Sequence, residues 1–290
     1  MKKSTLLILA SALVSGQVLA TTPGTDVIYG DDNRMDVFES RNSAYVEMSR
    51  STAAMIDPAN LRMKAGVVEI VSKTLRDRGI CAKERFSHQM SAANCSGFLI
   101  ADNVLVTAGH CIKTEADCRT QKWVFDYRVE APGQTSVTVH PSSVYSCSKI
   151  LTRALDTGTK DDFAVIQLDR KADRRPFPFR RSGRITPGTP ILVIGHPSGL
   201  PTKIADGANV RSLNQKFFTA NLDTYGGNSG SAVINAQSGE VEGILVRGEN
   251  DYVNDPAQGC KVSFRCANNA CRGEDVTYIS NIPGLMRNIR

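Results

Sequence analysis

The chain has 290 residues, and its formal net charge of +6 is too small to argue for nucleic acid as a partner. Its start is typical of a secretion signal: Lys2 and Lys3 precede an apolar run over Leu6–Leu13, and Val18–Ala20 supplies small residues at which a signal peptidase cuts. A membrane anchor is the alternative, but the apolar run is short for a bilayer, and no later segment is apolar enough to span one. We therefore expect residues 1–20 to be removed and the mature protein to be secreted or periplasmic.

Removal of these residues leaves 270 with a net charge of +4, a length that suits two small domains packed together. The segment 21–65 lacks a strong strand pattern, although Ser43–Met55 is a candidate for a short helix. From Gly66 onward, short apolar runs separated by turn residues are typical of an all-β protein. No long amphipathic helix interrupts them, which argues against a βαβ fold. The strands expected first are Gly97–Ile100, Val104–Thr107, Trp123–Val129, Ser136–Val139 and Phe163–Leu168.

A second group of strands follows a basic stretch, Lys171–Arg184, which contains Pro176 and Pro178 and has the composition of a linker. We therefore expect a first β-barrel over residues 66–170, a linker over 171–184, and a second β-barrel with a C-terminal segment over 185–290. The strands expected in the second barrel are Ile191–Gly195, Lys216–Leu222, Ser231–Ile234 and Val241–Arg247.

The eight cysteines of an exported chain predict disulfides rather than a metal site. Cys260, Cys266 and Cys271 lie close together, but the gaps of five and four residues between them do not match the usual zinc pairs. We expect no metal and no cofactor.

A candidate general base lies in Thr107-Ala108-Gly109-His110-Cys111, directly after an apolar strand. A histidine at a strand end, on a tight turn of small residues, is held in place, which suits proton transfer. Taken alone, His110 is equally well explained as an ordinary core or surface histidine. His196 follows a later strand but has no following strand that starts with Asp, so we interpret it as a loop residue.

A candidate acid lies in Asp161-Asp162, directly before the apolar run Phe163–Leu168. A carboxylate at the start of a buried strand needs a partner, because an unpaired buried charge is costly, and an imidazole N–H would serve. The alternative is that both aspartates cap a turn.

A candidate nucleophile lies in Gly226-Gly227-Asn228-Ser229-Gly230-Ser231, which opens an expected strand. Glycines around one serine let the backbone turn tightly and direct N–H groups at an oxyanion, each worth about 3–4 kcal/mol. A plain glycine-rich turn is the alternative. Because a strand rather than a helix follows, this is not the nucleophile elbow of α/β-hydrolases.

The order His110, Asp162, Ser229 is the chain order of chymotrypsin, and it differs from the orders in subtilisins and α/β-hydrolases. At these motifs the sequence resembles the trypsin-like, chymotrypsin-fold serine peptidases, over most of Gly66–Leu285. The resemblance implies an all-β fold of two packed six-stranded antiparallel barrels, with the active site in the cleft between them. It also implies a Cys95–Cys111 disulfide and an oxyanion hole formed by the N–H groups of Gly227 and Ser229.

The serine motif is closer to bacterial members, including glutamyl endopeptidases, and the run that begins at Val27 is similar to the start of the mature chain in that branch. This implies a short propeptide, Thr21–Asp26. Trypsin-like zymogens are activated when a new N-terminal amine pairs with an Asp before the serine. Asn228 stands at that position, so the ion pair cannot form.

The resemblance also points to three substrate-binding residues. Asp223, six residues before the serine, is expected at the floor of the specificity pocket, where a carboxylate favours Arg or Lys in the substrate. Arg247 stands on the expected pocket wall, where it would cancel Asp223 or attract an acidic substrate, and Gly248 would leave room for the substrate. The alternatives are a turn carboxylate for Asp223 and a strand-end turn for Gly248.

The expected function is peptide-bond hydrolysis through an acyl-enzyme, by a monomer that acts on proteins or peptides after Arg or Lys. The alternatives are a glutamyl-specific endopeptidase, a catalytically silent binding protein of the same fold, or an esterase. Seven basic residues cluster around the linker. We interpret this cluster as part of a solvated linker, and the alternatives are a patch that binds an anionic surface or a site of self-cleavage. Its members are Arg170, Lys171, Arg174, Arg175, Arg180, Arg181 and Arg184.

Overall fold

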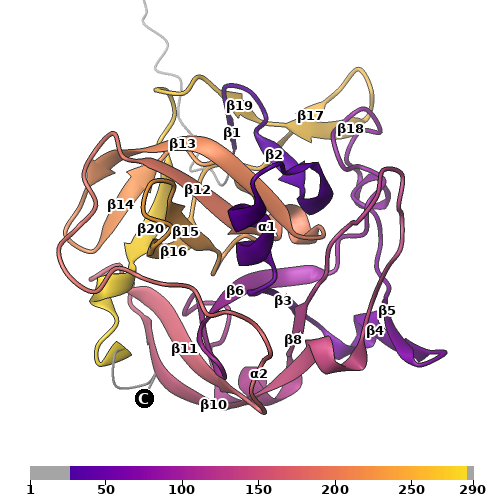
Figure 1. Ribbon diagram of the computed structural model, residues 1–290. Helices are drawn as coiled ribbons and strands as arrows, with labels where there is room; N and C mark the ends of the chain where they lie inside the picture. Colours follow the sequence, from indigo (N-terminus) through magenta and orange to yellow (C-terminus); the bar gives the residue numbers. More distant parts are fainter. Residues whose placement is uncertain (1–26, 286–290) are drawn as a thin grey trace, which may run out of the picture.

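The computed structural model describes residues 27–285. The expected signal segment 1–20 and the expected propeptide Thr21–Asp26 lie outside the described residues. Figure 1 shows two groups of strands, one occupying the lower half of the view and the other the upper half. Within the described part of the chain, no helix is long and apolar enough to cross a membrane.

The first group closes into a six-stranded antiparallel barrel in the order β10-β11-β7-β6-β3-β8. Its interior is filled by large apolar side chains with no exposed surface, among them Trp123 and Phe98. The six strands are β3 (Thr52–Ile56), β6 (Ala93–Ala101), β7 (Val104–Thr107), β8 (Lys122–Phe125), β10 (Val144–Leu155) and β11 (Asp162–Leu168).

The second group closes into another six-stranded antiparallel barrel, because its first strand, β12, pairs with both β15 and β13. The prediction of two six-stranded antiparallel barrels is therefore confirmed. The short strand β2 (Arg34–Asp36) adds to the outer side of β13. The barrel strands are β12 (Pro190–Gly195), β13 (Lys203–Leu213), β14 (Phe217–Ala220), β15 (Ala232–Asn235), β16 (Val241–Arg247) and β20 (Glu274–Tyr278).

The described part of the expected N-terminal segment, residues 27–65, contributes to both barrels. It supplies β2 to the second barrel and β3 to the first. The helix expected over Ser43–Met55 is correct only at its start: α1 covers Ser43–Ser49, where the Asn42 side chain caps its N-terminus, and the following residues form β3. The apolar run in β3 is fully buried between β6 and β8, and this burial outweighs its helix-like composition.

Smaller elements surround the barrels. Three minor sheets pair β1 (Ile28–Tyr29) with β19 (Arg265–Cys266), β17 (Tyr252–Asp255) with β18 (Cys260–Ser263), and β4 (Leu61–Lys64) with β5 (Val67–Ile70) and β9 (Val137–Val139). A second short helix is α2 (Glu115–Thr120). Single 3-10 turns are η1 (Val37–Glu39), η2 (Pro58–Asn60), η3 (Arg76–Arg78), η4 (Pro141–Ser143), η5 (Pro197–Gly199) and η6 (Ile279–Asn281).

All eight cysteines form disulfides: Cys81–Cys260, Cys95–Cys111, Cys118–Cys147 and Cys266–Cys271. The first joins residues 179 apart in the sequence, and it ties the loop before the first barrel's β6 to β18 at the edge of the second barrel. A link of this kind restricts how far the two parts of the chain can separate.

The inter-barrel linker is anchored rather than solvated. Phe177 and Phe179 are buried in the main core, and Phe177 meets Phe98 edge to face. Arg174 forms an ion pair with Asp126. Several basic side chains therefore hold the linker in place, and the interpretation as a solvated linker is wrong for this part of it. Arg180 likewise pairs with Glu242, Arg170 lies over the Tyr145 ring, and Arg184 lies over the Tyr278 ring.

Candidate active site

His110 and Asp162 meet in the first barrel, at the ends of β7 and β11. The Nδ1 atom of His110 lies 2.8 Å from Oδ2 of Asp162, and the His110 backbone N–H donates to Oδ1 of the same carboxylate at 3.1 Å. Asp162 is only 3% exposed, whereas the His110 side chain is 32% exposed. The buried carboxylate thus orients the imidazole and leaves its other face open to a reactant.

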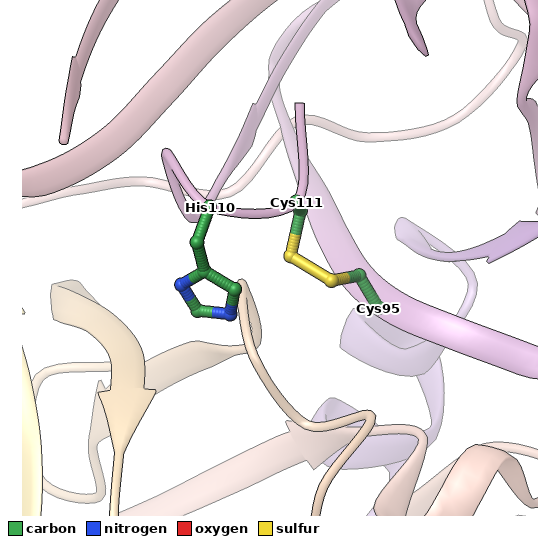
Figure 2. Close-up of side chains that lie close together, drawn as sticks. All are labelled: Cys95, His110 and Cys111. Carbon is green, nitrogen blue, oxygen red and sulfur yellow. A yellow bond between two sulfur atoms is a disulfide. The ribbon is translucent and has the colours of Figure 1, made fainter. Parts of the chain in front are cut away.

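The turn that carries His110 is fixed by close packing. A Cβ atom on Gly109 would lie 1.9 Å from the carbonyl oxygen of Ala154 in β10, so only glycine fits at that position. On the far side of the turn, Cys111 is bonded to Cys95 of β6. Figure 2 shows the His110 ring and this disulfide projecting side by side from the same turn. The local sequence therefore holds the imidazole at a defined place on the barrel rim.

Ser229 lies in the tight loop that leads into β15, and the backbone amides of this loop differ in their partners. The N–H groups of Gly226, Asn228 and Gly230 donate to the Asp251 side chain, the Tyr225 carbonyl and the Leu245 carbonyl, respectively. The N–H groups of Gly227 and Ser229 have no acceptor among residues 27–285. Two amides near the serine hydroxyl are therefore available to an incoming oxygen atom.

Gly227 makes this loop shape possible. Its φ of +98° is a conformation that side chains with a Cβ rarely adopt, and a Cβ there would lie 2.6 Å from the His196 carbonyl oxygen. The Asn228 side chain accepts a hydrogen bond from the Ser231 hydroxyl and is 2% exposed. Asn228 therefore stabilises its own loop.

Ser96, on β6 of the first barrel, connects the two halves of the site. Its backbone N–H donates to the Ser229 carbonyl at 2.8 Å, and its hydroxyl donates to the Gly227 carbonyl at 2.8 Å. Its own carbonyl accepts from the Thr107 hydroxyl, at the start of the His110 turn. This fully buried serine thus bonds to both the base-bearing turn and the serine loop.

The two halves also touch directly. The Cys111 sulfur lies 3.6 Å from the Ser229 carbonyl oxygen, immediately beside His110 in the sequence. The structure therefore pairs His110 with Asp162 and places the loop that carries Ser229 beside the His110 turn. Within residues 27–285, no hydrogen bond joins the His110 ring to the Ser229 hydroxyl.

His196 is a buried residue that contacts Ser96, the residue that joins the two halves of the site. It has no exposed surface, stacks on Tyr127 with 5.8 Å between ring centroids, and donates its backbone N–H to the Ser96 hydroxyl at 3.0 Å. Burial lowers its pKa to about 3, so its ring is neutral. The prediction that it lies in a loop outside the catalytic group agrees with its place at the start of η5.

Asp223 does not point at an open pocket floor. Its two carboxylate oxygens accept the backbone N–H groups of Tyr29 and Asn33, at 2.7 and 2.8 Å, and it is 4% exposed. Burial raises its pKa to about 6. In the structure, Asp223 anchors the N-terminal segment, an arrangement closer to the turn-carboxylate alternative than to a substrate selector.

Arg247 lies at the end of β16 and contacts two acids, neither of which is Asp223. Its Nε atom donates to Asp275 at 3.1 Å, and its Nη1 atom lies 3.7 Å from Asp162. Gly248 follows it, and the Arg272 guanidinium approaches the Gly248 carbonyl at 3.4 Å. Arg247 therefore lies beside Asp162, the carboxylate that contacts His110.

Glu274 is a buried acid near the serine loop that the sequence analysis overlooked. It has no exposed surface, and its carboxylate accepts a hydrogen bond of 2.7 Å from the hydroxyl of Thr224. Thr224 lies two residues before Gly226 in the sequence. Ser96 was overlooked as well. The only sequence signal for Ser96 is its place directly after Cys95 in an expected strand region, and Glu274 has no comparable signal.

Comparison with known proteins identifies the family of the chain. The family model for the trypsin-like peptidase domain matches residues 95–244. An extracellular metalloprotease of Bacillus subtilis (strain 168) is 28% identical over 157 residues, which are 51% of this chain and 48% of that protein. The serine protease HTRA1B of Danio rerio is 23% identical over 204 residues, 65% of this chain and 38% of that protein. The chain therefore spans about half or less of the length of these relatives.

A solved structure shares the fold. The VesB protease of Vibrio cholerae superposes with a TM-score of 0.50 and 15% identity, covering 86% of this chain and 64% of that one. A Glu endopeptidase in complex with MPD gives a TM-score of 0.46 and 18% identity, covering 88% and 95%.

The name of the Bacillus relative includes a metal, so the candidate ligands of this chain need a test. Among the described residues, Cys95, His110 and Cys111 place potential ligand atoms within 4.8 Å of one another. The two sulfurs are bonded to each other, so neither is a thiolate that can bind a metal ion. These three residues do not fit a metal site.

Proposed function

We propose, from the premise that this chain belongs to the trypsin-like peptidase family, that it is an exported serine endopeptidase whose catalytic residues are His110, Asp162 and Ser229. The observation that carries the proposal is the pairing of a partly exposed imidazole with a buried carboxylate, next to a serine loop in which two amides have no acceptor among residues 27–285. A general base, its orienting acid and an oxyanion site are the parts that acyl transfer requires.

The mechanism follows from these positions. His110 removes the proton from the Ser229 hydroxyl as its oxygen attacks the peptide carbonyl, and Asp162 holds the Nδ1–H and stabilises the imidazolium. The N–H groups of Gly227 and Ser229 bind the oxyanion. His110 then gives the proton to the leaving amine, and water hydrolyses the acyl-enzyme by the same route in reverse.

A fluorophosphonate probe and a Ser229→Ala variant test this assignment. We expect the probe to label Ser229 in the parent protein, and the variant to hydrolyse casein about a millionfold more slowly. Hydrolysis by Ser229→Ala at the parent rate would show that the nucleophile lies elsewhere. A parent protein that neither reacts with the probe nor cuts casein would favour the silent binding protein. Preferential hydrolysis of a short acyl ester over casein would favour the esterase.

For primary specificity we propose cleavage after Arg or Lys, with cleavage after Glu or Asp as the alternative. Two buried carboxylates lie near the serine loop, and both already accept hydrogen bonds: Asp223 from the backbone N–H groups of Tyr29 and Asn33, and Glu274 from the Thr224 hydroxyl and the Glu249 N–H. A carboxylate held in a buried position favours a cationic substrate side chain. Cleavage-site profiling on a mixed peptide library tests this. Cuts after Arg or Lys support it, and cuts after Glu or Asp favour the glutamyl alternative.

A further inference from the structure

A cavity of about 350 Å³ lies beside the serine loop, and Gly226 and Gly227 form part of its lining. Ala93 and Asn94, at the start of β6, line it as well, directly before Cys95 and its bond to the His110 turn. In the proposed mechanism His110 protonates the leaving amine, so the leaving half of the substrate must depart on the side of that turn. The cavity is therefore placed to receive the residues that follow the cleaved bond.

The outer walls of the cavity come from two distant parts of the chain. Leu75, Arg78 and Ile80 come from the loop before β6, and Tyr252 and Lys261 come from the β17–β18 hairpin. Figure 1 shows the hairpin at the upper right, beside this loop.

The two walls are fixed to each other next to the cavity. Ile80 and Lys261 form a parallel β-bridge, with backbone hydrogen bonds of 2.9 Å from the Cys81 N–H to the Lys261 carbonyl and from the Lys261 N–H to the Gly79 carbonyl. The disulfide Cys81–Cys260 reinforces the bridge. A cavity whose walls cannot separate is preformed, which reduces the entropy lost when a ligand binds.

The charges on the lining favour an anion. Arg78 and Lys261 are cationic, and Asp251 is the acid that lines the cavity with them. The Asp251 carboxylate accepts the Gly226 N–H at 3.1 Å, and the Arg78 guanidinium is held by the Ser91 carbonyl at 2.8 Å. The Lys261 ammonium makes no ion pair or hydrogen bond with any residue in the described range. Lys261 is therefore the charge most available to a ligand.

We propose that this cavity is a subsite for the leaving half of the substrate and that it selects a glutamate side chain there, through Lys261 and Arg78. Leu75 and Ile80 contribute apolar lining for the methylene groups of a glutamate, and Arg78 and Lys261 contribute the cations for its carboxylate. The inference rests on the proposed peptidase function and adds a preference on the far side of the cleaved bond.

The test uses peptides with one fixed acyl half and with Glu, Gln or Lys at each of the first three leaving-side positions. We expect kcat/KM of the parent protein to be about tenfold higher for Glu than for Lys at one of these positions, with the ratio falling at high salt. Lys261→Glu should invert this ratio, and Lys261→Gln should bring it close to one. Lys149→Glu, which changes an exposed lysine on β10, should leave the ratio as it is.

The outcomes separate the two proposals. A parent protein that cuts the peptides without a Glu preference, or with one that Lys261→Glu does not alter, overturns the subsite and leaves the peptidase standing. A parent protein that cuts none of the peptides and does not react with a fluorophosphonate overturns both. Inversion of the preference is a result that loss of folded protein cannot produce, because misfolding lowers both rates together.

Discussion

The turn around His110 and the surface that binds the N-terminal segment are each built on a buried aspartate that accepts two hydrogen bonds. Asp162 is 3% exposed and accepts from the backbone N–H and the ring of His110. Asp223 is 4% exposed and accepts from the backbone N–H groups of Tyr29 and Asn33. The two carboxylates are therefore similar in burial and in the number of hydrogen bonds that they accept.

The two aspartates differ in the groups that donate hydrogen bonds to them. Asp162 faces an imidazole that is 32% exposed, a side chain of the kind that transfers protons in general acid–base catalysis. Asp223 faces peptide amides, which do not titrate and which fix the position of the chain. We therefore propose that Asp162 acts in catalysis, because one of its partners is an imidazole, and that Asp223 holds the chain in place, because its partners are backbone groups.

Replacing each aspartate by asparagine is the strongest way to break this comparison. We expect Asp162→Asn to lower kcat about 10⁴-fold, because an amide no longer holds the reactive tautomer of His110. Asp223→Asn should keep kcat within a few-fold, since its partners are the amides of the N-terminal segment. Steady-state kinetics on one peptide with Arg before the cleaved bond measures both.

The same pair of variants can contradict the comparison. If Asp223→Asn abolishes cleavage after Arg while cleavage after neutral residues survives, Asp223 is the selector that its sequence position predicts, and the anchoring role is secondary. If Asp162→Asn retains the parent rate, the His110–Asp162 contact is only structural.

Ser96→Ala tests the connection between the two barrels and has an intermediate expected effect. The substitution removes the donor to the Gly227 carbonyl and the acceptor of the His196 N–H, both buried. We expect a loss of about 3 kcal/mol in the free energy of unfolding, and a drop of about tenfold in kcat as the serine loop moves relative to His110. Urea unfolding and kinetics on the same preparation measure the two effects.

Ser148→Ala is the matched control, because its hydroxyl is exposed and donates to the Gln167 carbonyl at the barrel rim. We expect its free energy of unfolding to change by less than about 0.5 kcal/mol. Equal behaviour of the two alanine variants would mean that Ser96 does not connect the barrels as we infer.

The parts of the site carried by short motifs could be predicted from the sequence. Gly109 and Gly227 mark positions where a Cβ does not fit, and such positions are visible as glycines next to His110 and Ser229. The strands Val104–Thr107 and Val241–Arg247 have the bounds that their apolar runs predict. A residue that local packing requires can therefore be recognised from its neighbours in the sequence.

The parts that depend on distant contacts could not be predicted. Ser96 and Gly227 are 131 positions apart, and Asp223 and Tyr29 are 194 apart, so no spacing rule connects them. The strand β10 was overlooked because most of its residues are only partly buried and its sequence mixes polar and apolar side chains without alternation. The overlooked residues are those whose roles depend on which surfaces meet after the barrels close.

The pH dependence of stability, which involves no expected change in kcat, sharpens the comparison further. Burial raises the pKa of Asp223 from 3.8 to about 6, so the folded protein holds this proton more tightly than the unfolded chain does. The stability from this group is complete below pH 3.8 and is lost as the pH rises through about 6. We expect the unfolding free energy of the parent protein, relative to Asp223→Asn, to fall by up to about 3 kcal/mol across this window. Urea unfolding of both proteins at several pH values measures the difference. A carboxylate in a wet pocket floor would give no such decline, so a flat difference would return Asp223 to the substrate pocket.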